Sequence, residues 1–216
     1  MDQRDDRPVR VIYPGAACQR NPGGPGGWGF VIFQDGQQPK ENRGGMAMLP
    51  TSSPMEVTSQ RMELMAVFMA LESLDRPARV TLFSSSRYVI DAGNSNLGKW
   101  KRNGWMTSAK RAHEPPGQVA NKQLWQRVDK ARGLHEVRWK HVPRHAGDPH
   151  NERAHELAVE GMEAAAFNSP ESRAGSAFTW NSDHLGVHFP PAQAPSPSHS
   201  RVPGPNASGG HTDPAS

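Results

Sequence analysis

Residues 9–33 read VRVIYPGAACQRNPGGPGGWGFVIF, and this stretch decides how the fold begins. Residues 9–13 have the pattern of a strand, and residues 28–33 form a second run of residues that favour strands. Between them, residues 21–27 are all Asn, Pro or Gly, which is typical of a turn. The sequence therefore predicts two consecutive strands joined by this turn.

The rest of the chain alternates between helices and strands. Further strands are predicted near residues 46–49, 79–83 and 136–142. Helices are predicted at residues 61–74 with Ser59 as the N-cap, and at residues 86–92, 122–132 and 151–166. Three strands followed by helices alternating with strands indicate an α/β fold with a mixed five-stranded sheet flanked by helices.

The composition changes near the end of the chain. From residue 167 to residue 216, 22 of the 50 residues are Pro, Gly or Ser. Such a segment cannot bury enough apolar surface to offset its ordering entropy, so we expect a disordered tail. Residues 1–8 are then an N-terminal extension, and residues 9–166 form one domain.

The chain has 216 residues, a net charge of +4 and one cysteine, Cys18. No apolar run approaches the roughly 20 residues of a membrane span, and the charged N-terminus lacks the apolar core of a signal peptide. A lone cysteine cannot form an internal disulfide. We therefore expect a soluble, cytoplasmic monomer with no membrane partner, whose mild positive charge permits an anionic ligand.

Glu63 is the first residue that indicates chemistry. It lies just inside a predicted helix whose residues 62–71 are apolar almost all round, so this helix is expected to be buried on most faces. A carboxylate there is costly unless it is paired, hydrogen-bonded or metal-bound. The alternative is that Glu63 lies in the first turn and only favours the helix dipole.

A cation-rich section with tryptophans follows at residues 99–105, which read KWKRNGW. No acidic residue occurs between Asp91 and Glu114. Basic side chains neutralise phosphates, and aromatic rings stack on bases, which favours contact with nucleic acid. The alternative is an exposed basic face whose tryptophans belong to the core.

Four histidines lie close together in the sequence, at His141, His145, His150 and His155. They fall on a strand, in a loop and at the start of a helix, and no cysteine accompanies them. A zinc site needs converging ligands, usually four, in a fixed geometry. We do not expect zinc here.

Together, these segments resemble type 1 ribonuclease H from residue 9 to about residue 162. The matching stretches follow the family's order and approximate spacing, at residues 21–29, 61–66, 86–89, 100–105, 124–127 and 145–153. The resemblance implies a ribonuclease H-like fold and a family that cuts the RNA strand of RNA–DNA hybrids with two magnesium ions. Four carboxylates, in the order Asp, Glu, Asp, Asp, hold these ions in the family, and a loop histidine assists.

Only part of that site carries over to this chain. Glu63 retains the family's Glu, and His145 retains the loop histidine. Gly15, Ser85 and His155 stand where the family has its three aspartates. Magnesium prefers hard oxygen ligands, and two ions need bridging carboxylates. With Glu63 as the one remaining ligand, we expect no stably bound cofactor and little or no hydrolysis.

Pro14 lies beside the first of these positions, in the predicted central strand. A proline lacks the N–H group that would donate to a neighbouring strand. We therefore expect this end of the strand to be remodelled relative to that of an active enzyme.

The family's duplex-binding positions are better retained. By resemblance they are Asn21, Thr58, Ser59, Gln60, Lys99, Trp100, Lys101, Arg102, Trp105 and Asn151. Proteins recognise such a duplex mainly through its shape, phosphates and 2′-hydroxyl groups. Ser59 and Gln60 stand where the family usually has two asparagines, so the 2′-hydroxyl contacts are expected to differ.

The sequence leaves three functions in competition. The first is a ribonuclease H-family protein that binds RNA–DNA hybrid, or a related duplex, without hydrolysing it. The second is a working hybrid ribonuclease with a remodelled site, in which Glu63, His155 and one supplied ligand hold manganese. The third is a protein-binding scaffold. For the first, we expect binding without magnesium, because fewer carboxylates repel the incoming phosphates.

Overall fold

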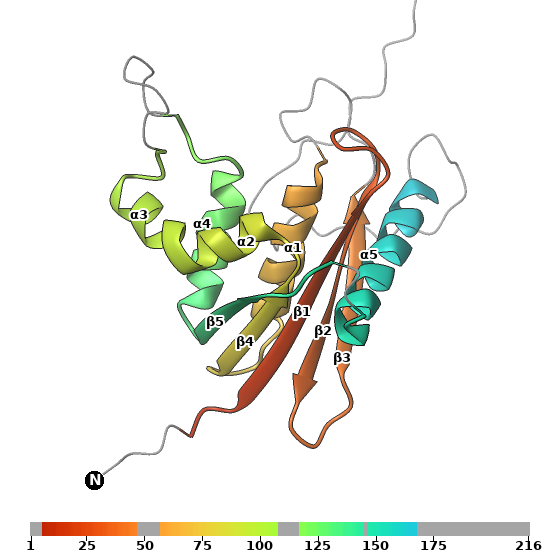
Figure 1. The fold of residues 1–216 in the computed structure, drawn as a ribbon, viewed down its shortest axis with the longest axis horizontal. Coiled ribbons are helices and arrows are strands. Elements are labelled where there is room, and N and C mark those ends of the chain that lie inside the picture. The colour runs from red at the N-terminus through yellow and green to blue at the C-terminus, as the bar shows by residue number, and fades with distance from the viewer. Residues whose placement is uncertain (1–5, 47–56, 108–116, 145–146, 168–216) are drawn as a thin grey trace, which may run out of the picture. The chain divides into compact units, whose positions relative to one another are not determined.

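The strand pair at the start of the chain belongs to a five-stranded sheet with the order β3-β2-β1-β4-β5 (Figure 1). The strands are β1 (Val9–Cys18), β2 (Gly26–Gln34), β3 (Lys40–Met46), β4 (Arg79–Ser84) and β5 (Glu136–His141). β2 runs antiparallel to both β1 and β3, whereas β4 runs parallel to both β1 and β5. The predicted mixed five-stranded sheet is therefore confirmed.

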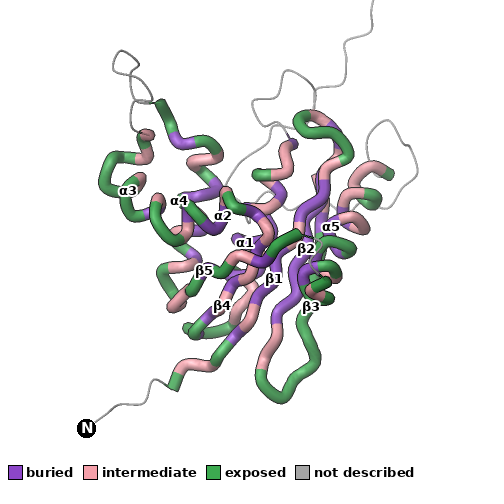
Figure 2. The backbone as a smooth tube through the Cα atoms, viewed as in Figure 1, coloured by how far each residue is buried: buried purple, intermediate pink, exposed green. Residues whose placement is uncertain are grey.

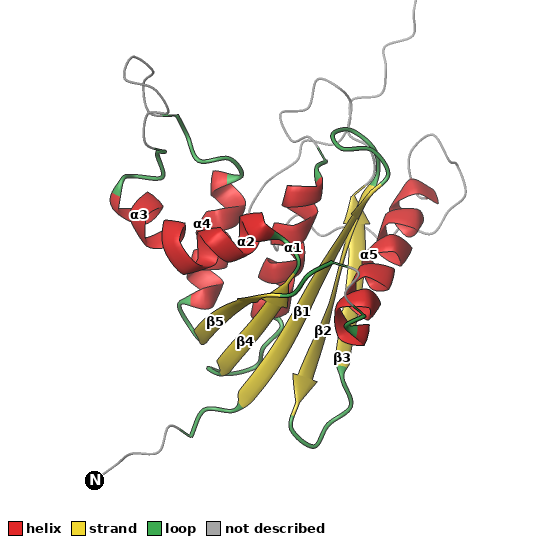
Figure 3. Ribbon diagram, in the orientation of Figure 1, coloured by secondary structure: helices red, strands yellow, loops and turns green. Residues whose placement is uncertain are grey.

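The computed structural model describes residues 6–46, 57–107, 117–144 and 147–167. The helices are α1 (Ser59–Glu72), α2 (Arg87–Asp91), α3 (Leu97–Arg102), α4 (Lys122–Arg132) and α5 (Pro149–Phe167), as Figure 3 shows. A π-helical turn, η1 (Ala92–Asn96), joins α2 to α3. Within the described residues, no helix combines the length and the apolar character that crossing a bilayer requires.

The two long helices cover opposite faces of the sheet, because successive residues of a strand point to opposite sides. A β-carbon added at Gly26 would meet Met62 of α1, whereas one added at Gly27 would meet Ala158 of α5. α1 also packs against α4, whose Trp125 is fully buried. Enclosed between the sheet and α4, α1 buries most of its residues, as predicted (Figure 2).

The edge strand β3 is the largest correction to the predicted strands. It ends at Met46 and does not begin there, and residues 47–49 lie outside the described part of the chain. Four polar residues, 40–43, open the strand and are exposed. A hydrophobic pattern does not reveal a strand that faces solvent, although charged side chains are typical of sheet edges.

Several helix boundaries also differ from those predicted. The N-cap of α1 is Thr58, and not Ser59, because the Thr58 hydroxyl accepts from the backbone N–H of Arg61 at 3.2 Å. The helix expected at residues 86–92 continues through η1 into α3, a helix that the sequence analysis did not predict. In contrast, the helix at residues 122–132 has the predicted bounds. The predicted tail and most of the N-terminal extension, residues 168–216 and 1–5, lie outside the described residues.

β1 continues past Pro14 as far as Cys18, which is further than predicted. Its parallel pairing with β4 ends at Ile12, opposite Leu82, whereas its antiparallel pairing with β2 runs to the end of the strand. Pro14 therefore lies beyond the last residue pair that joins β1 to β4, where a missing N–H group costs the parallel ladder nothing.

Gly15, the next residue of β1, is one of the strand glycines on which the backbone of α5 packs directly. A β-carbon built on Gly15 would lie 2.2 Å from the carbonyl oxygen of Ala154 and 2.4 Å from its carbonyl carbon. These are backbone atoms of α5, which cannot rotate away as a flexible side chain could. The observed packing of α5 on β1 therefore requires glycine at this position.

We expect Gly15→Ala to destabilise the fold by about 1–3 kcal/mol, because α5 must shift to admit the added methyl group. Urea denaturation measures this change. Gly98→Ala on α3 is the matched control, because its β-carbon would meet only the Arg102 side chain, at 3.5 Å. Equal stabilities of Gly15→Ala and the parent would contradict the close approach.

Candidate functional site

The positions carried over from the family lie around the ends of β1 and β4. Gly15 on β1 faces α5, and a β-carbon there would be 2.7 Å from the backbone nitrogen of His155. Ser85 directly follows β4, and the next residue, Ser86, donates its hydroxyl to the carboxylate of Glu63 on α1. The structure thus brings Gly15 together with His155 and places Glu63 beside the end of β4.

Glu63 is held by two neighbours. Its side chain is only 14% exposed; Oε2 accepts from the Ser86 hydroxyl, and Oε1 lies 3.9 Å from Nη2 of Arg144. Burial raises the pKa of Glu63, whereas the hydrogen bond from Ser86 and the charge of Arg144 act in the opposite direction. Glu63 lies beyond the first turn of α1, so the alternative of a simple dipole role is wrong.

Ser86 can position the carboxylate because it is itself fixed. It is buried at the N-cap of α2, where its Oγ accepts from the backbone N–H of Val89 at 3.4 Å. Its own backbone N–H donates to Oγ of Ser84, the last residue of β4, at 3.1 Å. The hydroxyl that holds Glu63 is therefore anchored to both β4 and α2.

His155 is attached to the backbone of β1. Its side chain projects from α5, and its Nδ1 lies 3.1 Å from the carbonyl oxygen of Ala16. The neighbouring position, Gly15, is filled by the backbone of α5. Two of the three positions that lack the family's aspartate thus make direct contacts between α5 and β1, while Ser85 is half-buried at the turn after β4.

These residues do not fit two magnesium ions. Of the four positions, only Glu63 supplies a carboxylate, and its two oxygens already face Ser86 and Arg144. Magnesium requires several hard oxygen ligands, and a two-metal site requires shared carboxylates. Within the described part of the chain, no three Asp, Glu, His or Cys side chains gather as metal ligands. The predicted loop histidine, His145, lies outside that part.

The other described histidines belong to separate parts of the fold. His150 packs on the rings of Phe33 and Tyr13, with centroid distances of 4.3 and 5.4 Å. His141 ends β5. Neither shares a candidate metal-ligand group with His155 among the residues that the structure places.

Four of the predicted duplex-binding residues meet at the N-terminus of α1. Asn21 accepts from the backbone N–H of Ser59 at 3.3 Å, which ties the β1–β2 turn to the helix. Thr58 caps α1, and Gln60 is exposed. Asn151, in contrast, is buried with 8% exposure in the first part of α5. The first four residues therefore form a polar surface, whereas Asn151 supports the fold from inside.

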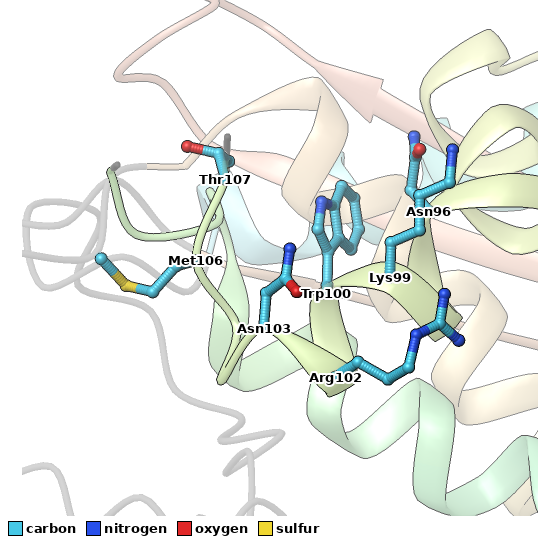
Figure 4. A pocket seen from close by; sticks show the side chains of 7 residues that line it. All are labelled: Asn96, Lys99, Trp100, Arg102, Asn103, Met106 and Thr107. Carbon is cyan, nitrogen blue, oxygen red and sulfur yellow. The ribbon is translucent and has the colours of Figure 1, made fainter. Parts of the chain in front are cut away.

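The predicted basic section surrounds a pocket of about 290 Å³ at α3 (Figure 4). Its lining residues are Asn96, Lys99, Trp100, Arg102, Asn103, Met106 and Thr107. Figure 4 shows the Trp100 ring between the side chains of Asn103 and Lys99. The pocket thus combines two cations, amide groups and an aromatic ring, which suits a phosphate and its sugar.

The remaining members of this section have structural contacts. Trp100 also packs on the buried Trp125 of α4, with 5.6 Å between ring centroids. Lys101 points to α4 as well and pairs with Asp129 at 3.0 Å. Trp105 is half-buried and accepts from the backbone N–H of Val119 through its carbonyl oxygen at 3.1 Å. Trp100 therefore contacts a core residue and also lines the pocket, while contact of this section with nucleic acid stays a prediction.

Sequence reasoning did not single out Ser86 or Arg144. Each stands next to a position that it did single out: Ser86 follows Ser85, and Arg144 precedes His145. Their positions next to Ser85 and His145 were the signal in the sequence that could have indicated a role for them. Their role depends on contacts with Glu63, which only the folded chain creates.

We expect Glu63→Gln to stabilise the fold more at neutral than at acidic pH. Because burial raises the pKa of Glu63, the folded chain holds its proton more tightly than the unfolded chain. The contribution of Glu63 to the free energy of unfolding therefore falls as the pH rises above its ordinary pKa of 4.5. Urea denaturation of both proteins at about pH 4 and about pH 7 checks this. A stability difference that does not widen at the higher pH would contradict it.

Comparison with known proteins adds to this geometry. The family model for RNase H matches residues 7–163. A protein named Ribonuclease H from Dinoroseobacter shibae is 45% identical over 172 residues, which cover 78% of this chain and 99% of the relative. Another, from Bordetella pertussis, is 45% identical over 154 residues, covering 71% of this chain and 89% of the relative.

Solved structures show the same fold. LC9-RNase H1, described as a type 1 RNase H with the type 2 active-site motif, is similar with a TM-score of 0.59 and 26% identity, over 74% of each chain. LC11-RNase H1, solved in complex with RNA/DNA hybrid, gives a TM-score of 0.51 at 21% identity, over 72% of this chain and 98% of that one. With a family model that covers most of its length and relatives at 45% identity, the chain belongs to the RNase H family.

Proposed function

We propose that this RNase H-family chain binds RNA–DNA hybrid and has lost, or nearly lost, the ability to hydrolyse it. The observation that supports a loss of hydrolysis concerns Glu63. It is the one carboxylate left among the four family positions, and its two oxygens already face Ser86 and Arg144. Gly15 adds to it, because the backbone of α5 fills the space of a side chain there. A two-metal hydrolysis needs bridging carboxylates that these positions do not supply.

Two surfaces support the binding half of the proposal. The pocket at α3 presents Lys99 and Arg102 beside the ring of Trp100. At the N-terminus of α1, Asn21 is tied to Ser59 next to the exposed Gln60. Cations neutralise backbone phosphates, and polar groups address 2′-hydroxyl groups, which together suit a hybrid duplex. LC11-RNase H1, which has the same fold, was solved in complex with RNA/DNA hybrid.

Hydrolysis of the RNA strand is the second candidate, and the relatives favour it. Proteins at 45% identity over most of this chain are named Ribonuclease H, so family membership alone does not support a loss of activity. The motif described for LC9-RNase H1 also indicates that a type 1 fold accepts a departure from its usual site. The case for loss therefore rests on this chain's own residues.

A binding assay with labelled hybrid tests the first half of the proposal. At fixed ionic strength, we expect the full chain to bind hybrid equally well in magnesium and in a chelator, because no described carboxylate cluster requires neutralisation. Affinity should fall steeply with salt, as phosphate contacts require. Absence of hybrid binding, or binding that requires magnesium, would overturn this part.

The same protein and hybrid test the second half when cleavage is followed in magnesium and in manganese. We expect no cleavage above background from either the parent or Glu63→Gln. Cleavage by the parent that Glu63→Gln abolishes would establish the second candidate function. Cleavage that survives in Glu63→Gln identifies a contaminating nuclease. Both proteins are then purified again before their cleavage is compared.

The pocket at α3 gives a further expectation. The double variant Lys99→Gln/Arg102→Gln should bind hybrid about tenfold more weakly, and its log–log salt slope should be shallower by about two, because two phosphate contacts are lost. The control Arg76→Gln/Lys130→Gln removes the same charge from exposed residues outside the pocket. Equal affinities of the two double variants would rule out a specific role for the pocket.

A further inference from the structure

Arg144 is a cation beside Glu63, and the positions carried over from the family do not include it. It lies between β5 and α5, and its side chain is 57% exposed. Its Nη2 is 3.9 Å from Oε1 of Glu63, the carboxylate that resembles a metal ligand. A guanidinium group therefore faces the Glu63 oxygen that is not bonded to Ser86.

We propose that Arg144 binds a backbone phosphate of the hybrid beside Glu63, in place of a metal ion; this inference rests on the proposed function. The guanidinium group has five N–H donors and pairs with phosphate through two parallel hydrogen bonds. The contact with Glu63 occupies one nitrogen at a distance longer than a hydrogen bond. The exposed remainder of the group is available to the ligand.

Glu63 makes the position of Arg144 specific. The carboxylate is 14% exposed and bonded to Ser86, which is anchored to β4 and α2. Because Glu63 is fixed in this way, its carboxylate cannot move out into solvent. Its negative charge attracts the long side chain of Arg144 toward the end of the sheet. The pair holds a cation at the site without any metal, and a phosphate there competes with Glu63 for the guanidinium group.

The test compares Arg144→Gln with Arg76→Gln in the full-length chain, using labelled RNA–DNA hybrid in chelator. Arg76 is an exposed arginine in the loop between α1 and β4, before the first residue of β4, whereas Glu63 is bonded to Ser86, after its last residue. We expect Arg144→Gln to weaken binding about tenfold at low salt and to make the salt slope shallower by about one. Arg76→Gln should change affinity by less than about twofold.

Two further variants separate phosphate binding from a general effect of charge. Arg144→Lys should restore only part of the affinity, because an ammonium group lacks the planar pair of donors. Glu63→Gln should tighten binding a few-fold by removing the competing carboxylate. This gain should be clearly smaller in Glu63→Gln/Arg144→Gln, where only the general loss of a negative charge remains.

The outcomes distinguish this inference from the proposed function. Hybrid binding by the parent with equal affinities for Arg144→Gln and Arg76→Gln overturns the role of Arg144 and leaves the proposed function standing. No hybrid binding by the parent overturns both. Thermal unfolding of each variant checks that its fold is intact. A tightening in Glu63→Gln that is equally large without Arg144 also contradicts the inference.

Discussion

The contact between the backbone of α5 and the backbone of β1 at Gly15 is the constraint on which the rest of this site depends. A β-carbon there would lie 2.2 Å from a carbonyl oxygen of the helix, so helix and strand meet without an intervening side chain. This packing sets where His155 lies, and its ring in turn reaches the carbonyl oxygen of Ala16. The space between α5 and β1 is therefore occupied by protein atoms, and an aspartate on β1 has no room to extend.

The electrostatics around Glu63 follow from the same three replacements. Four clustered carboxylates repel one another and an incoming phosphate unless cations neutralise them. Here Glu63 is the one carboxylate at the four positions, and it is bonded to Ser86 and faces Arg144. Under the proposed function, a phosphate backbone therefore meets a single carboxylate with a guanidinium group beside it.

Much of the fold could be predicted from the sequence, because its elements carry local signals. α4 was predicted with its observed bounds, since Leu124, Trp125 and Val128 repeat on one face and Gly133 follows the last turn. β3 was misplaced, because its exposed polar residues give no hydrophobic pattern. In the site, resemblance identified Gly15 as a replaced ligand position, but a glycine in a strand does not reveal which backbone approaches it. The contact of Glu63 with Arg144 likewise joins distant parts of the chain, so no spacing predicts it.

Membership of the RNase H family does not decide whether the four metal-ligand positions can bind metal. Dozens of buried residues maintain a fold, whereas a metal site depends on a few side chains. Relatives at 45% identity settle the family membership. Metal binding depends on the packing of α5 and on Arg144 as well as on the side chains at the ligand positions. An aspartate at Gly15 would collide with α5 before it could meet a metal ion. Even a correctly placed carboxylate would still find Glu63 engaged by Arg144 and Ser86. Two-metal chemistry at these four positions would therefore require the helix to move as well as the replacement of three side chains.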